Sequence, residues 1–149
     1  MDCIFCKIIS GEFPSAKIWE DENFIAILDI NPNIKGLTLV IPKKHYHSDV
    51  SLMPDKDFQE LMLAAKKVVG ILKKGLNVNW VAIIIEGLGV NHVHIKLYPL
   101  HGTEKEFQET YAKEKVFFEN YKGYISTQLG PEMSIEELGK IAEEIKSRI

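Results

Sequence analysis

The sequence has little of several features that mark special classes of protein. It contains two cysteines and two tryptophans in 149 residues, and its formal net charge is −3, from 18 basic and 21 acidic side chains. Two cysteines cannot build a scaffold of several disulfides, and so small a charge gives no indication of a nucleic-acid or anionic-membrane partner. Lysine, aspartate or asparagine interrupts every hydrophobic run before it reaches the ~20 residues that cross a bilayer. We therefore expect a globular protein with no nucleic-acid or membrane partner.

What is present suits one domain in the cytoplasm. A chain of 149 residues with 46% hydrophobic residues can fill a single core. The first seven residues, MDCIFCK, lack the layout of a signal peptide. In the cytoplasm, two cysteines separated by two residues form a metal or redox site more often than a structural disulfide.

Hydrophobic periodicity predicts an α+β domain. A helical pattern of apolar residues starts at Pro54, with Asp55 and Asp57 in its first turn, and ends near Gly75. Apolar runs bounded by turn residues predict five strands, over residues 16–20, 24–29, 37–42, 79–86 and 92–98. We expect an antiparallel sheet with the long helix packed on it.

The last third of the chain has a different pattern. Residues 134–137 (SIEE) form a capping box that opens an amphipathic helix, and a weaker pattern predicts another helix over 104–121. Residues 121–131 either fold over a ligand pocket or pack against the sheet or a partner subunit, and we expect packing. We divide the chain into a ligand-binding part, 1–102, and a C-terminal helical extension of the same domain, 103–149.

One predicted strand concentrates the reactive side chains. Alternation over residues 92–98 (HVHIKLY) places His92, His94, Lys96 and Tyr98 on one face and the apolar residues on the other. Clustered basic groups depress one another's protonation. Neutral imidazole is a nucleophile, and a nearby cation stabilises developing negative charge. A phosphate site is one interpretation; an ordinary solvated strand face is the other.

Four separate segments resemble the histidine triad (HIT) family, over roughly residues 2–101. They are 3–12 (CIFCKIISGE), 28–32 (LDINP), 36–45 (GLTLVIPKKH) and 92–96 (HVHIK). The resemblance implies a HIT-like fold and a homodimer that pairs through the long helix and the following strand. It also implies hydrolysis or nucleotidyl transfer at the α-phosphate of nucleoside phosphoramidates or dinucleoside polyphosphates.

The resemblance also assigns roles to residues. His92 and His94 match the first two histidines of the triad, and together with Lys96 they are the catalytic residues that the resemblance implies. His94 matches the nucleophile that becomes a nucleotidyl-histidine, and Lys96 stands where the family has its third histidine, as a phosphate contact. Asp29 matches the carboxylate that binds the ribose hydroxyls, a suitable acceptor for two donors. The apolar residues that match the pocket for a purine nucleotide are Ile4, Phe5, Ile27 and Ile30.

The sequence departs from the family pattern in three places. Lys96 replaces the third histidine, for which nucleotide-transferring branches have glutamine. Leu88 and Gly89 stand where typical members have Gly-Gln-Ser, and Ile85 replaces an asparagine. These departures leave a second hypothesis open, a nucleotide-binding module with little or no turnover. A third is an interaction protein stabilised by zinc, without nucleotide affinity.

The two cysteines have the spacing of half a tetrahedral zinc site. By the resemblance, the other ligands are His45 and His92, so that Cys3, Cys6, His45 and His92 form a closed, structural Zn²⁺ site beside the nucleophile. A redox pair and two free thiols are the alternatives. His47 is the spare ligand, and we expect His101 in a surface loop.

Overall fold

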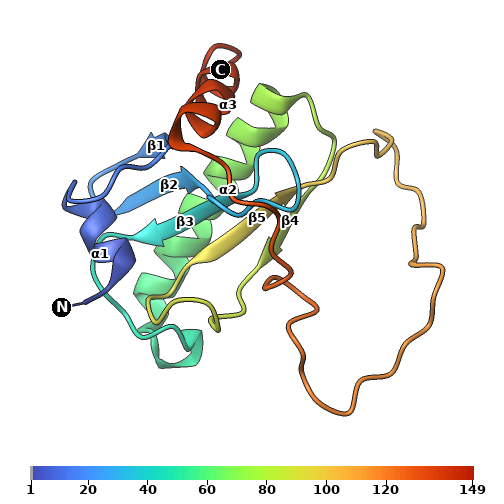
Figure 1. Ribbon diagram of the computed structural model, residues 1–149, viewed down its shortest axis with the longest axis horizontal. Coiled ribbons are helices and arrows are strands. Elements are labelled where there is room, and N and C mark those ends of the chain that lie inside the picture. The colour runs from blue at the N-terminus through green and yellow to red at the C-terminus, as the bar shows by residue number, and fades with distance from the viewer. Residues whose placement is uncertain (1) are drawn as a thin grey trace.

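The computed structural model describes residues 2–149 and has one five-stranded sheet with three α-helices in that range (Figure 1). Neighbouring strands are antiparallel, in the order β1-β2-β3-β5-β4. The strands are β1 (Lys17–Glu20), β2 (Phe24–Leu28), β3 (Thr38–Pro42), β4 (Val81–Ile84) and β5 (Ile95–Pro99). The helices are α1 (Ile4–Ile9), α2 (Asp55–Leu76) and α3 (Ile135–Lys146), with a short 3-10 helix over Val50–Leu52. The predicted α+β class is confirmed.

The sheet separates two apolar clusters because its strands alternate. In β2, Phe24, Ala26 and Leu28 lie in the larger cluster with α2 and α3, whereas Ile25 and Ile27 lie in a smaller cluster with α1. Since successive side chains of a strand point to opposite faces, every residue of β2 can be buried. The face covered by α1 carries the candidate site.

Helix α2 forms as the apolar periodicity predicts. Asp55 and Asp57 lie in its first turn and Lys73 and Lys74 in its last, where each charge opposes the helix dipole. The helix ends at Asn77, whose φ of 53° is the left-handed conformation typical of a helix C-terminus. None of the helices in residues 2–149 is long and apolar enough to span a membrane.

Helix α3 packs against the C-terminal end of α2 and against β1 (Figure 1). Its predicted capping box is present, because Ser134 accepts from the backbone of Glu137 and the Glu137 carboxylate accepts from Ser134. The two helices meet at Gly75, where an added Cβ would lie 2.6 Å from Ile145 Cγ2 and 2.8 Å from the Ile145 backbone. The C-terminal helix therefore shares the core of the first hundred residues.

We expect Gly75→Ala to destabilise the protein and Gly70→Ala to stabilise it. Both glycines lie in α2, but an added Cβ at Gly70 meets nothing within 4 Å, so alanine there gains helix propensity of up to ~1 kcal/mol. At Gly75 the methyl group forces α3 to move, at a cost of about 1–3 kcal/mol. Urea denaturation of both variants measures the difference. Equal stabilisation by the two alanines would contradict the close packing of α2 on α3.

The helix predicted over residues 104–121 does not form. Residues 101–133 contain no helix or strand and run as a long loop away from the sheet before returning to it (Figure 1). The apolar side chains of this loop include Phe107, Tyr111 and Phe117, each at least 80% exposed. They have no regular helical spacing, and an isolated helix of this length is marginal without a surface to pack on. Residues 104–121 therefore lack the interactions that would stabilise a helix.

Candidate functional site

The histidine segment runs into β5 from the loop before it. The strand begins at Ile95, three residues later than predicted, but the predicted division of faces is present. Val93, Ile95 and Leu97 are fully buried in the cluster under α2. The side chains between them lie on the opposite face, where α1 packs, and His92 and His94 are both buried there.

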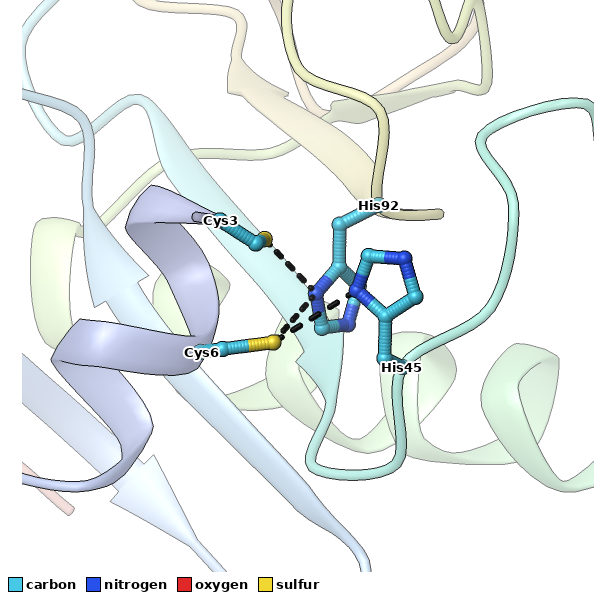
Figure 2. Close-up of side chains that lie close together, drawn as sticks. All are labelled: Cys3, Cys6, His45 and His92. Atoms are coloured by element: carbon cyan, nitrogen blue, oxygen red, sulfur yellow. Dashed lines mark hydrogen bonds between the residues drawn. The ribbon is translucent and has the colours of Figure 1, made fainter. Parts of the chain in front are cut away.

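Two cysteines and two histidines from three parts of the chain converge at the N-terminus of α1 (Figure 2). Their ligand atoms all lie within 4.8 Å of one another. Cys3 Sγ is 3.4 Å from His92 Nδ1, Cys6 Sγ is 3.4 Å from His45 Nδ1, and Cys6 Sγ is 3.7 Å from His92 Nδ1. We call Cys3, Cys6, His45 and His92 the metal-ligand cluster.

The metal-ligand cluster fits a tetrahedral zinc ion. Zinc bond lengths of about 2.3 Å to sulfur and 2.0–2.1 Å to nitrogen place sulfur and nitrogen ligands about 3.6 Å apart, close to the distances here. His92 Nε2 is 2.9 Å from the Pro42 carbonyl. A carbonyl only accepts, so the ring proton lies on Nε2, and Nδ1 presents its lone pair to the cysteines.

Burial in the metal-ligand cluster favours the uncharged forms of Cys6 and His92. Burial, followed by the neighbouring Cys3, raises the pKa of the Cys6 thiol, and burial lowers the pKa of His92. A bound cation would favour the thiolate over the thiol, because the thiolate is the metal ligand.

His47 lies outside the cluster and accepts from the Asp49 backbone. His101 is exposed, as expected, and contacts the Lys35 carbonyl.

His94 is oriented by its own strand. Its Nδ1 is 2.8 Å from the His92 carbonyl, so the proton lies on Nδ1 and Nε2 of the neutral ring carries the lone pair. Burial lowers the pKa of His94 and Lys96 lowers it further, against opposing effects of the His92 bond and Asp29. The Phe5 ring packs edge-on at 5.1 Å between centroids. The result is a neutral imidazole in a fixed orientation.

The predicted nucleotide-binding residues gather around the end of β2 and α1, but their exposure differs. Phe5 and Ile27 are buried in the cluster under α1, whereas Ile4 and Ile30 are 42% and 47% exposed. Asp29 is buried and accepts from the Asn31 backbone through Oδ1. Two apolar side chains are therefore exposed, and one of them, Ile30, follows the Asp29 carboxylate directly in the chain.

Lys96 is held among polar groups instead of extending into solvent. Its Nζ lies 3.4 Å from Asp29 Oδ2 and donates to the Ser126 carbonyl at 2.9 Å. The Tyr98 hydroxyl donates to the same carbonyl at 3.1 Å. Burial, then the nearby Asp29 and Glu86, raise the pKa of Tyr98 to about 12, so the phenol keeps its proton at neutral pH.

The return of the long loop supplies residues that the sequence pattern did not identify. Ser126 is 3% exposed, and both its backbone N–H and its hydroxyl donate to Glu86 Oε2. Residues 121–131 therefore contact β5 through Ser126, beside the candidate site. This contact has features of both alternatives, because the segment lies against the sheet and also brings polar groups to the site. The one sequence feature at this contact is Glu86, an acidic residue two positions beyond the apolar strand β4.

Comparisons with known proteins agree with this arrangement. A model of the HIT domain matches residues 10–102. An uncharacterised HIT-like protein of Methanocaldococcus jannaschii is 44% identical over 108 residues, 70% of this chain and 83% of that protein. An adenosine 5'-monophosphoramidase of Candida albicans is 36% identical over 106 residues, 65% and 69% of the two chains. The crystal structure of a zinc-bound histidine triad family protein from Mycobacterium smegmatis has a TM-score of 0.65 at 28% identity, covering 99% and 94% of the two chains. Because the family model covers more than half of its length, this chain belongs to the HIT family.

Proposed function

We propose that the protein hydrolyses or transfers nucleotides at the α-phosphate of nucleoside phosphoramidates or dinucleoside polyphosphates, through a covalent nucleotidyl-His94 intermediate. The observation that carries this proposal is the orientation of His94. A neutral imidazole whose Nδ1 donates to a carbonyl has its Nε2 lone pair free for attack on phosphorus. The Candida albicans relative is an adenosine 5'-monophosphoramidase, which supports the same reaction class.

The neighbouring residues suit this chemistry. Attack by His94 Nε2 forms a phosphorus–nitrogen bond as the bond to the leaving group breaks, and water or another acceptor then attacks the intermediate. Negative charge on the phosphate oxygens grows in the transition state, and the Lys96 ammonium is placed to stabilise it. Lys96 then serves as a point charge in place of the hydrogen-bonding imidazole of a third histidine.

The nucleoside would bind at the end of β2. Ile4 and Ile30 offer exposed apolar surface for a purine base, with Phe5 and Ile27 buried behind them. The Asp29 carboxylate accepts the ribose hydroxyls in this proposal. His92 contributes indirectly, since its carbonyl orients His94.

We further infer that the metal-ligand cluster binds zinc in a structural role. Its four ligands leave no open position for a substrate, and a relative from Mycobacterium smegmatis is zinc-bound.

A homodimer through α2 and β4 fits the exposed surface, because β4 is an edge strand and both Ile83 and Leu63 are exposed. The cysteine spacing favours the cytoplasm.

The second candidate is a nucleotide-binding module with little turnover. Lys96 is engaged by Asp29 and by the Ser126 carbonyl, and His94 is only 5% exposed. In this alternative, both residues stay fixed when the nucleotide binds. The two candidates differ in whether a covalent intermediate forms.

Intact-mass measurement tests the proposal. We expect brief acid quenching of the protein with adenosine phosphoramidate or diadenosine tetraphosphate to trap an adenylyl adduct, absent from His94→Ala. An adduct on both chains would move the nucleophile elsewhere. No adduct and no turnover, with AMP still bound, would leave the binding module. No AMP binding in a thermal-shift assay would leave only a metal-stabilised interaction protein.

A further inference from the structure

The return of the long loop brings the buried hydroxyl of Ser126 against the Glu86 carboxylate, beside the proposed phosphate contact Lys96. We define the Ser126 segment as residues 126–133. It lies against the turn between β2 and β3, where Gly130 N–H donates to the Asn31 carbonyl at 3.0 Å and Met133 N–H donates to the Ile30 carbonyl at 2.8 Å. The same turn follows Asp29, so the segment is attached to one wall of the candidate site.

Close backbone approach fixes the path of the Ser126 segment. An added Cβ at Gly130 would lie 2.0 Å from the Pro32 carbonyl oxygen and 2.8 Å from the Asn33 nitrogen. No side chain fits there without moving the backbone. The Asn33 amide also donates to the Gln128 carbonyl at 2.7 Å.

The opposite end of the segment is anchored to the end of β4. Glu86 Oε2 accepts from both the backbone N–H and the hydroxyl of Ser126. Glu86 Oε1 is buried with no hydrogen-bond partner within residues 2–149, and a buried unpaired oxygen costs stability. Both hydrogen bonds that the Glu86 carboxylate makes within the described residues therefore go to Ser126, through Oε2.

The anchored serine in turn restrains Lys96. Its carbonyl accepts from Lys96 Nζ, and Asp29 faces the same ammonium, so that the Lys96 side chain is only 12% exposed. A lysine ammonium ends a flexible stem and takes many positions unless neighbouring groups fix it. Two acceptors from different parts of the chain give Lys96 one position, two residues along the chain from His94 and on the same face of the strand.

We propose that Ser126 and Glu86 are positioning residues for the reaction: Glu86 fixes Ser126, and the Ser126 carbonyl holds the Lys96 ammonium where negative charge develops on the transferred phosphate. This inference rests on the proposed function, because it assigns the Ser126 segment to the same nucleotidyl chemistry. The segment thereby supplies from residue 126 part of the polar surroundings that the short loop 87–91 lacks.

Two measurements on Ser126→Ala and Glu86→Gln test the inference. Acylation of lysines by acetic anhydride, mapped by peptide mass spectrometry, reports the accessibility of Lys96 without any requirement for activity. Lys44, whose side chain is 74% exposed, serves as the internal standard. We expect Lys96 acylation relative to Lys44 to rise severalfold in both variants. Thr127→Ala is the matched control, because its hydroxyl contacts only the exposed Tyr121.

Steady-state kinetics supply the second measurement. Misplacement of a charge that acts in the transition state should lower kcat by about 10- to 100-fold with little change in KM. Unchanged Lys96 acylation in both variants would overturn the inference, as would raised acylation with unchanged kcat. A native protein without turnover would overturn the proposed function itself and, with it, this role for Ser126, so the two failures are distinguishable.

Discussion

Replacing His94 by glycine should lower turnover of an adenosine phosphoramidate by at least about 10⁴-fold, the scale at which loss of a nucleophile or its base stops an enzyme. His94 is the only neutral imidazole of the β5 segment with a nitrogen unclaimed by protein, since His92 bonds the Pro42 carbonyl through Nε2 and faces the cysteines through Nδ1. We expect added imidazole to restore part of the activity of the glycine variant by entering the space left by the ring. Single-turnover kinetics with and without imidazole measure both effects.

Two controls make the His94 prediction specific. His101→Ala removes an exposed histidine that contacts only the Lys35 carbonyl, and it should leave turnover unchanged. AMP binding by the His94→Gly variant shows that its pocket is still folded. A glycine variant that binds AMP and keeps native turnover would refute His94 as the nucleophile.

Much of the fold could be predicted because its signals are local. The apolar stripe and terminal charges of α2, the capping box of α3 and the alternation of Val93, Ile95 and Leu97 each depend on neighbours within a few residues. The C-terminal third shows the opposite case. The helix predicted over 104–121 was wrong, because a weak pattern needs a surface to pack on before it becomes a helix. Phe107, Tyr111 and Phe117 are each at least 80% exposed and give no such packing.

Part of the candidate site could also be predicted from the sequence, and part could not. Cys3, Cys6, His45 and His92 were found through the family resemblance, and the structure brings them together although 89 residues separate the first from the last. No pattern in one sequence linked Glu86 to Ser126 across 40 residues, because hydrogen bonds between distant loops leave no periodicity.

Removing the metal should lower the melting temperature by about 12 °C. The metal-ligand cluster joins α1, the loop after β3 and the loop before β5, so a bound ion stabilises the folded chain but not the unfolded one. A metal at 1,000 times its dissociation constant adds about 4.1 kcal/mol, and each kcal/mol corresponds to roughly 2–4 °C for a chain of this size. Differential scanning calorimetry with and without a chelator measures the shift, and elemental analysis should find one zinc per chain.

Two histidine variants connect this stabilisation to the cluster. His45→Ala removes one ligand and should reproduce the loss in melting temperature while abolishing the response to chelator. His47→Ala is the matched control, because His47 lies two residues away, is exposed and contacts only the Asp49 backbone. His92 belongs to the metal-ligand cluster, and its carbonyl also orients His94. We therefore expect metal loss to loosen His94 and lower kcat at temperatures where the chain stays folded. A chelated protein with native melting temperature and native kcat would show that Cys3, Cys6, His45 and His92 pack as a neutral cluster and need no ion.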